Sequence, residues 1–225
     1  DLDVAPRQPG GLVVLEHVPV RGRHRHAGAE SLLQEFRAAR VIAVSPRWAK
    51  ESQTTEFRCG LDGGAQIVQY RDKTKRTALR IDQASQLHAL CKLYGALFIV
   101  NDDVNLAQAV NADGVHLGEL DDKLEKARAK MPDKIIGVSC YNQLERAIDA
   151  EQRGANYVAF GSFFASDTKP DAVRASLDLL RDAWQHVSIP IVAIGGSTVD
   201  NAAEVIEAGA DAVAVVRAVF DADDV

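Results

Sequence analysis

The sequence predicts an α/β fold, a single (β/α)8 TIM barrel over residues 41–225. Short apolar runs rich in β-branched residues alternate with longer segments of helical period, which is typical of parallel strands joined by helices. Eight such runs with seven intervening helices match the number of units that closes a barrel. The length of 225 residues also fits, because barrels commonly occupy about 200 to 250 residues as one domain.

The predicted strands and helices alternate strictly along the chain. Strands are expected at 41–45, 66–70, 97–100, 114–117, 135–139, 157–161, 191–194 and 212–216. Helical spacing of apolar residues predicts helices at 52–62, 76–93, 104–111, 122–131, 142–153, 171–187 and 199–208. Gly95, Gly154 and Gly209 each follow a predicted helix, where glycine readily adopts the left-handed conformation that ends it. An open doubly wound sheet is the alternative, but no GxGxxG motif follows the first strand.

The two ends of the chain differ from this repeating pattern. Residues 1–40 are predicted to form a partly flexible extension, in which the spacing of Leu32, Leu33 and Phe36 indicates one short helix. The basic stretch at 21–26 is interpreted as a solvated linker without a function of its own. The sequence ends at Val225, soon after the eighth strand, so the last helix is expected to be shortened.

Composition excludes several classes of partner. The formal net charge is −6, with 26 basic and 32 acidic side chains, which argues against a general nucleic-acid binder. No apolar run approaches the roughly 18 to 20 residues of a membrane span, so no membrane partner is expected. Cys59, Cys91 and Cys140 show no CxxC spacing, which indicates reduced thiols and a cytoplasmic location. We therefore expect small-molecule ligands; the sequence leaves open whether the protein is a homo-oligomer.

Polar side chains gather where the predicted strands end, and in barrels the loops after the strands carry function. Arg71 and Lys73 lie two residues apart, so on an extended chain both leave one face and can converge on a polyanion such as pyrophosphate. The alternative is a solvated turn. Asp102 and Asp121 follow neighbouring strands and offer the oxygen ligands that Mg²⁺ prefers. Helix capping is the alternative role of this acidic motif, and Asp103 is the better candidate for the cap.

Further candidates for anion binding follow strands six and seven. Gly195 and Gly196 let the backbone approach a ligand closely and lead toward a helix N-terminus, which favours a phosphate. A plain tight turn is the alternative. Ser166, Thr168 and Lys169 supply two hydroxyls and a cation in a loop that either folds over a bound anion or is only a surface loop.

The histidines and the absence of a nucleophile motif bear on the type of reaction. His116 either points into the barrel mouth as a hydrogen-bond donor or is a buried histidine with satisfied hydrogen bonds. His88 and His186 lie on predicted helices and are expected at the surface. The sequence contains no Ser-His-Asp order or nucleophile elbow, so covalent hydrolysis has little support. Two anionic subsites at one mouth instead indicate a transfer reaction in which pyrophosphate leaves.

Several motifs occur in a fixed order: VQYRDK at 68–73, NDD at 101–103, ADGVHLG at 112–118 with Asp121, IGVS at 136–139, VAFGSFF and SDTKP within 158–170, and AIGG at 193–196. With these motifs the chain resembles the thiamine-phosphate synthase family over roughly residues 41–220. The resemblance implies that 4-amino-5-hydroxymethyl-2-methylpyrimidine pyrophosphate condenses with thiazole phosphate. Thiamine phosphate and pyrophosphate would be the products, with Mg²⁺ as the cofactor.

The resemblance also implies a role for each matching position. The pyrophosphate would be held by Arg71, Lys73, Asn101 and Lys169, the Mg²⁺ by Asp102 and Asp121, and the pyrimidine by Gln69 and Ser139. The thiazole phosphate partner would meet Ser166, Thr168 and the backbone near Gly195, Gly196, Val216 and Arg217. The catalytic set implied in this way is Arg71, Lys73, Ser139 and Lys169.

Three positions depart from the family pattern. Glu119 replaces the usual Gln and could alter metal affinity, and Arg217 replaces a small residue and could strengthen or crowd phosphate binding. Ser197 replaces Ile and is expected to leave a backbone contact unaffected. Two other functions stay under consideration, a thiazole tautomerase-like enzyme and a non-catalytic thiamine phosphate-binding paralogue. The retained set of basic and acidic residues counts against the tautomerase.

Overall fold

The computed structural model describes residues 41–45, 53–118, 122–165, 173–198 and 200–216. Its strands are β1 (Val41–Val44), β2 (Ile67–Tyr70), β3 (Leu97–Asn101), β4 (Gly114–Leu117), β5 (Ile135–Tyr141), β6 (Tyr157–Phe160), β7 (Ile191–Ile194) and β8 (Ala212–Val215). Its helices are α2 (Gln53–Asp62), α3 (Thr77–Tyr94), α4 (Val104–Ala109), α5 (Asp122–Lys130), α6 (Leu144–Gln152), α7 (Leu177–His186) and α8 (Ala202–Glu207). The predicted extension at 1–40, its helix, and the chain beyond 216 lie outside the described residues.

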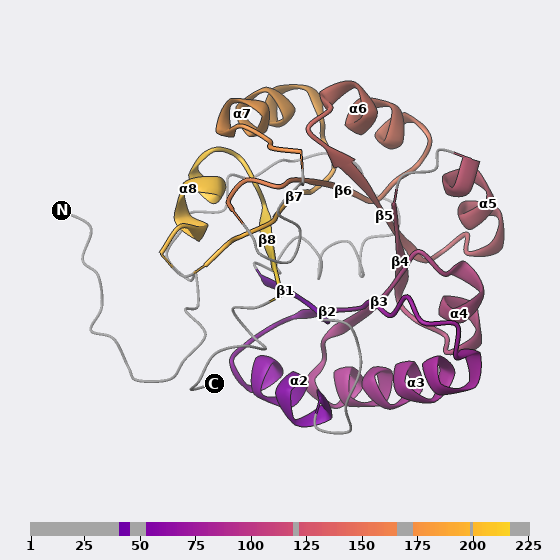
Figure 1. The fold of residues 1–225 in the computed structure, drawn as a ribbon. Coiled ribbons are helices and arrows are strands. Elements are labelled where there is room, and N and C mark those ends of the chain that lie inside the picture. Colours follow the sequence, from indigo (N-terminus) through magenta and orange to yellow (C-terminus); the bar gives the residue numbers. More distant parts are fainter. Residues whose placement is uncertain (1–40, 46–52, 119–121, 166–172, 199, 217–225) are drawn as a thin grey trace.

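The eight described strands are parallel and close into a barrel in the order β1 to β8. The helices form a ring outside the strands, as Figure 1 shows in a view along the barrel. This arrangement confirms the predicted (β/α)8 fold. A parallel barrel needs both faces of each strand buried, and the Val-rich and Ile-rich runs of this chain satisfy that need.

The largest difference from the predicted helices is at α7. A helix was expected from residue 171, but α7 begins at Leu177, where the Ser176 hydroxyl caps it by accepting the Leu179 N–H at 3.3 Å. The chain before it pairs with the end of β6 instead. The Ser162 N–H donates to the Val173 carbonyl at 2.9 Å, and the Ala175 N–H donates to the Ser162 carbonyl at 3.0 Å. The apolar residues that suggested a helix therefore belong to an extended segment.

Alternate residues of each strand enter different apolar layers. One layer lies between strands and helices and includes Val68, Phe98 and Val100, whereas the barrel interior holds a separate cluster. The described core of that interior cluster comprises Ile42, Val44, Ile67, Leu97, Ile99, Ile135, Tyr157, Ala159, Val192, Ala212 and Ala214. The next inward residues are polar: Gln69 follows Ile67 on β2, and Asn101 follows Ile99 on β3. The alternation therefore brings a polar layer to the C-terminal end of the strands.

His88 contradicts its predicted surface position. It is only 4% exposed, its Nδ1 lies 2.9 Å from the Val110 carbonyl oxygen, and its ring stacks on Phe98 at 5.3 Å between centroids. His186 is exposed, as predicted. Cys91 and Cys140 are buried and Cys59 is half-buried, and none of the three forms a disulfide.

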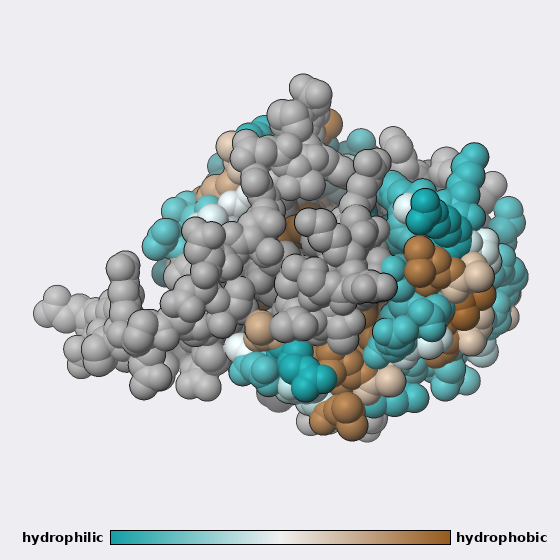
Figure 2. Space-filling model, turned by 60° about the horizontal axis from the view of Figure 1, so that its bottom comes forward, coloured by the Kyte–Doolittle hydropathy of each residue, from teal (hydrophilic) through white to brown (hydrophobic). Residues whose placement is uncertain are grey.

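The described surface is largely hydrophilic on the face drawn in Figure 2, with hydrophobic side chains interspersed. Four of the exposed large hydrophobic residues, Leu79, Ile81, Leu93 and Tyr94, lie on α3. Among the helices of the described ranges, none combines the length and the hydrophobicity that crossing a membrane requires.

Candidate active site

Four inward polar residues line the C-terminal end of the barrel. Gln69 lies on β2, Asn101 on β3, His116 on β4 and Ser139 on β5, so the four stand on consecutive strands. The register pairs Asn101 with His116, which places these two side chains next to each other. Three of the four, Gln69, Asn101 and Ser139, are residues that the sequence predicts for substrate binding.

His116 is a buried histidine with both ring nitrogens engaged. Its Nδ1 lies 2.8 Å from the Tyr157 hydroxyl, and its Nε2 lies 2.8 Å from the Ser139 hydroxyl. Burial lowers the pKa of His116 to about 4, and the nearby Asp102 carboxylate opposes this shift only in part. The imidazole is therefore neutral at pH 7, and of the two interpretations the buried, satisfied histidine is confirmed.

Tyr157 belongs to this polar layer although sequence reasoning did not select it. Burial raises the pKa of its hydroxyl above the usual value, and a smaller opposite effect comes from a hydrogen bond with the Gln69 side chain. Its ring fills the space beside Gly137, where an added Cβ would lie 2.0 Å from the ring. A glycine inside a predicted strand was the available signal, because such a glycine often marks a close approach of another group.

The cationic part of the mouth follows β2. The Arg71 N–H donates to the Ser45 hydroxyl at 2.7 Å, which ties the start of this loop to the end of β1. Asp72 accepts hydrogen bonds from the Thr74 N–H and hydroxyl, each at 2.8 Å, and these bonds form a turn. Lys73 extends from this turn, with Nζ 4.0 Å from Asp102 Oδ2. The predicted turn is thus present, and Lys73 faces an acidic residue that directly follows the next strand, β3. Convergence of Arg71 with Lys73 on one anion stays a prediction.

Asp102 is held in an unusual backbone conformation beside Gly118. Its φ of 62° lies in the left-handed region, and its Oδ1 accepts the Gly118 N–H at 3.0 Å. An added Cβ on Gly118 would lie 3.1 Å from the same oxygen, so a side chain there would press on the carboxylate. Asp103 caps α4 by accepting the Leu106 N–H at 2.9 Å. The prediction that Asp103 caps this helix is confirmed. The prediction that Asp102 is a metal ligand stays a prediction.

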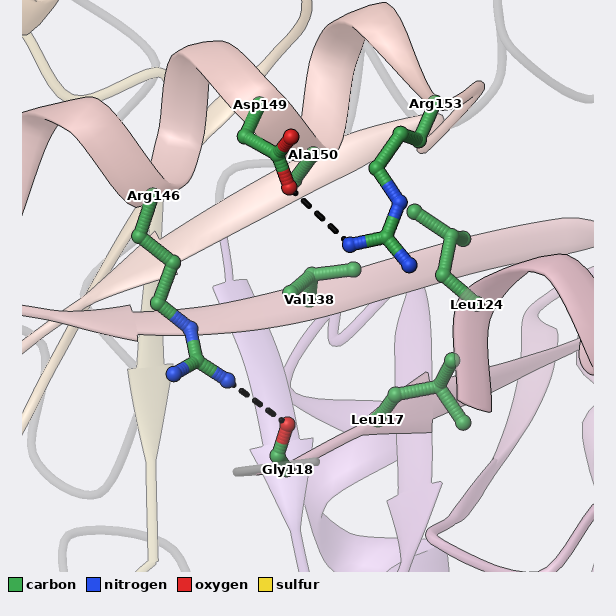
Figure 3. Close-up of a pocket in the computed structure, with 8 residues that line it drawn as sticks. All are labelled: Leu117, Gly118, Leu124, Val138, Arg146, Asp149, Ala150 and Arg153. Carbon is green, nitrogen blue, oxygen red and sulfur yellow. Dashed lines mark hydrogen bonds and ion pairs between the residues drawn. The ribbon is translucent and has the colours of Figure 1, made fainter. Parts of the chain in front are cut away.

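Gly118 also lines a small pocket. Its lining comes from β4, β5, α5 and α6 and comprises Leu117, Gly118, Leu124, Val138, Arg146, Asp149, Ala150 and Arg153. Figure 3 shows Arg146 directed at Gly118, with Nη2 donating to the Gly118 carbonyl at 3.2 Å, and Arg153 directed at Asp149. The Arg146 guanidinium also lies 5.5 Å from the centre of the Tyr141 ring. Gly118 is therefore held at its N–H by Asp102 and at its carbonyl by Arg146.

The donor set at Asp102 fits a hydrated magnesium ion. Mg²⁺ is commonly bound through one or two carboxylates together with substrate phosphates and water. Asp102 offers a partly exposed carboxylate at the mouth, with Oδ2 on the side of Lys73. The described residues contain no group of three or more His, Cys, Asp and Glu side chains arranged to hold a metal ion. An all-protein metal cage is thus not a feature of the described part of the chain.

Gly195 and Gly196 form the opposite part of the mouth, after β7. Their φ angles of 103° and 69° favour glycine, and an added Cβ would lie 2.1 Å from the Ser162 hydroxyl at Gly195 and 2.4 Å from the Ala165 carbonyl at Gly196. The glycines do not lead directly into a helix, because α8 begins only at Ala202 and Asn201 donates back to the Gly196 carbonyl at 3.1 Å. The helix therefore begins three residues later than predicted, and the phosphate site at these glycines stays a prediction.

Two neighbours complete the described part of this region. Ser197 is 8% exposed, and its hydroxyl has no hydrogen-bond partner among the described residues. Val216 packs against the interior cluster at the end of β8. The remaining residues implied by the resemblance, Asp121, Ser166, Thr168, Lys169 and Arg217, lie outside the described residues, as does Glu119.

The fold and the polar C-terminal end of the strands together define a (β/α)8-barrel enzyme. The family model described as thiamine monophosphate synthase matches residues 41–219. Thiamine-phosphate synthase from Nitrosospira multiformis is 55% identical over 166 residues, which cover 73% of this chain and 71% of the relative. The corresponding protein of Thiobacillus denitrificans is 51% identical over 176 residues, covering 78% of this chain and 83% of the relative.

A solved structure agrees with these relatives. Thiamine phosphate pyrophosphorylase from Pyrococcus furiosus superposes with a TM-score of 0.76 at 38% identity, covering 86% of this chain and 92% of the other. The chain belongs to the thiamine monophosphate synthase family, a family of transferases.

Proposed function

We propose that this protein condenses 4-amino-5-hydroxymethyl-2-methylpyrimidine pyrophosphate with thiazole phosphate, forming thiamine phosphate and releasing pyrophosphate. The names of its relatives support this reaction. The observation that carries it is the approach of Lys73 Nζ to Asp102 Oδ2, 4.0 Å apart at the barrel mouth. A cation beside a carboxylate that fits Mg²⁺ is an arrangement that suits a leaving pyrophosphate.

The leaving group is the part of the substrate whose charge changes most. As pyrophosphate departs, negative charge builds on its oxygens and positive charge on the pyrimidine methylene carbon. Arg71, Lys73 and Asn101, with Lys169, would hold the oxygens, and fixed cations stabilise the developing charge. Mg²⁺, held by Asp102 and Asp121, would supply further charge neutralisation when bound.

Orientation of the two substrates is the second requirement. Gln69 and Ser139 would hold the pyrimidine at the end of β2 and β5. Ser166, Thr168 and the backbone near Gly195, Gly196, Val216 and Arg217 would hold the thiazole phosphate. Because the thiazole nitrogen attacks a carbon that is already positioned, the protein needs no nucleophile of its own. The buried hydroxyl of Ser197, beside Gly196, supports a phosphate contact in this region.

The test is release of pyrophosphate when the full chain is mixed with both substrates and Mg²⁺, with each component omitted in turn. We expect release only when all components are present. Release that does not depend on thiazole phosphate would indicate simple hydrolysis and contradict the proposal. Tight binding of thiamine phosphate without any release would instead identify a binding protein. We further propose that the protein works on these small molecules in the cytoplasm.

A further inference from the structure

Arg146 occupies a position that does not favour its own helix. It lies in the first turn of α6, at the end of the helix where the aligned peptide dipoles favour negative charge, beside the acidic Glu145. A cation at this position costs α6 some stability, so helix formation does not explain it. Figure 3 shows where the side chain reaches: Nη2 donates to the Gly118 carbonyl, just after β4, at 3.2 Å.

The ring of Tyr141 limits where the Arg146 side chain can lie. Tyr141 is the last residue of β5, and the pairing of β5 with β6 shifts register between Ser139 and Tyr141. Its φ of 54° lies in the left-handed region, which is uncommon for a tyrosine. The Arg146 guanidinium lies over this ring at 5.5 Å from its centre, within the range of a cation–π contact. The ring and the Gly118 carbonyl therefore hold the guanidinium together.

Gly118 joins this guanidinium to the Asp102 carboxylate through its two backbone groups. Its carbonyl accepts from Arg146, and its N–H donates to Asp102 Oδ1 at 3.0 Å. Gly118 is the first residue after β4, and a glycine has no side chain to restrict its backbone dihedral angles. The hydrogen bond from Arg146 supplies that restriction. An added Cβ on Gly118 would lie 3.1 Å from Asp102 Oδ1, so a displacement of Gly118 reaches the carboxylate directly.

The two oxygens of Asp102 have different surroundings. Oδ1 accepts the Gly118 N–H, whereas Oδ2 lies 4.0 Å from Lys73 Nζ at the barrel mouth. The Asp102 side chain is 37% exposed, so solvent leaves the carboxylate room to turn about its Cβ–Cγ bond. The bond to Gly118 opposes this rotation and keeps Oδ2 available for a cation. Hydrogen-bond partners that orient a metal ligand typically change metal affinity by about 10- to 100-fold.

We propose that Arg146 is a positioning residue for Mg²⁺: it holds Gly118, which in turn holds the Asp102 carboxylate in the orientation that binds a hydrated Mg²⁺ with pyrophosphate. The proposal rests on the proposed function for Asp102 as the ligand and for pyrophosphate as the anion. Arg146 acts on the metal through Gly118 and Asp102. Its removal should therefore weaken binding of the metal complex and leave binding of metal-free pyrophosphate unchanged.

The test measures binding of a preformed complex of Mn²⁺ and inorganic pyrophosphate to the full chain, by the relaxation of water protons. Arg146→Met keeps an apolar chain of similar length beside Tyr141 but removes the donor. We expect this variant to bind the complex about tenfold more weakly than wild type. Arg146→Lys keeps a donor and a charge, so it should recover most of the loss. Metal-free pyrophosphate, measured by calorimetry with a chelator present, should bind both variants as it binds wild type.

Arg153→Met is the matched control. Arg153 follows the end of α6 and lines the same pocket, but its guanidinium is directed at Asp149, at 3.0 Å, and at Glu125, at 3.6 Å. This variant should bind the Mn²⁺ complex as wild type does, and urea unfolding shows that both Met variants are folded. Equal weakening in the two variants would assign the effect to packing around the pocket and overturn the proposal.

Steady-state turnover separates the role of Arg146 from the proposed reaction. Arg146→Met should raise the Mg²⁺ concentration for half-maximal activity about tenfold, with kcat at saturating Mg²⁺ within about twofold of wild type. Continued turnover with unchanged binding of the Mn²⁺ complex would overturn the role of Arg146 and leave the proposed function standing. A wild-type chain that binds the Mn²⁺ complex no better than metal-free pyrophosphate would overturn it as well. If the expected binding pattern occurs without pyrophosphate release from the two substrates, the proposed reaction fails while the role of Arg146 stands.

Discussion

The two ends of the barrel interior use the same strands in different ways. On β3, Leu97 and Ile99 face the apolar interior cluster, whereas Asn101, the next inward residue, belongs to the polar layer. On β2, Ile67 is followed in the same way by Gln69. The strand period determines which residues point inward, and the position along the strand determines whether they serve stability or ligand binding. Variants at the two ends should therefore fail in different ways.

The largest effect is expected from the apolar end. Ile99 is fully buried in the interior cluster, so Ile99→Ala should lower the free energy of unfolding by about 4 kcal/mol, through lost contacts and a cavity. Urea unfolding measures this, and activity per folded molecule should change little. Leu93→Ala, at a residue 83% exposed, should change stability by less than about 0.5 kcal/mol. Equal losses in both variants would show that the apolar end is not the stabilising one.

The second-largest effect is a loss of stability at low pH, caused by His116 at the polar end of the barrel interior. The pKa of His116 is about 4 in the folded protein and 6.5 in the unfolded chain. The unfolded chain therefore binds the extra proton as pH falls from about 6.5 to 4, and the free energy of unfolding decreases over this window by up to about 3 kcal/mol. Urea unfolding at several pH values measures it. His116→Asn should reduce this slope, whereas variants of the exposed His186 should retain it.

Arg71→Ala is expected to affect catalysis without much effect on folding. The backbone of Arg71 is held by Ser45, so the loop should persist when the side chain is removed. Loss of a cation at the leaving pyrophosphate should lower kcat roughly 100-fold, about 2.7 kcal/mol in the activation free energy. Steady-state release of pyrophosphate measures this, with Lys75→Ala as the control at a nearby exposed cation. A normal rate in Arg71→Ala would remove this residue from the site.

The smallest effect is expected from Gly118, which lies against the Asp102 carboxylate. Gly118→Ala would place a Cβ 3.1 Å from Asp102 Oδ1, so the carboxylate must shift by a few tenths of an ångström. We expect a several-fold increase in the Mg²⁺ concentration needed for half-maximal activity, about 1 kcal/mol in binding free energy. Titration of activity with Mg²⁺ measures it. An unchanged Mg²⁺ requirement would show that Asp102 does not bind the metal.

The comparison also explains which predictions from sequence succeeded. The positions of the strands, to within two residues at each end, the Asp103 cap and the left-handed conformations of Gly95, Gly154 and Gly209 depend on a few neighbouring residues, and the structure confirms them. The motifs that indicated the family also lie in short segments at strand ends, and the family is confirmed. Of the residues implied for the site, Gln69, Arg71, Lys73, Asn101, Asp102 and Ser139 all lie at the C-terminal ends of β2, β3 and β5, as predicted.

Predictions that depend on distant parts of the chain were less successful. His88 was expected at the surface, but packing against Phe98 and Val110 buries it, and its helical spacing alone does not reveal that contact. The segment before α7 had apolar residues suited to a helix, yet hydrogen bonds to Ser162 keep it extended. Tyr157 was not selected at all, because its partner His116 lies 41 positions away in the chain.

The sequence by itself therefore determined the barrel, the family and the polar strand ends, since strand period, helix period and short motifs are local properties. Only the tertiary structure decided that His116 contacts both Tyr157 and Ser139, that Asp102 contacts Gly118, and that α8 begins only at Ala202. The physical reason is that closing the barrel brings strands from distant parts of the sequence side by side. The hydrogen bonds that form across them then depend on side-chain packing in three dimensions.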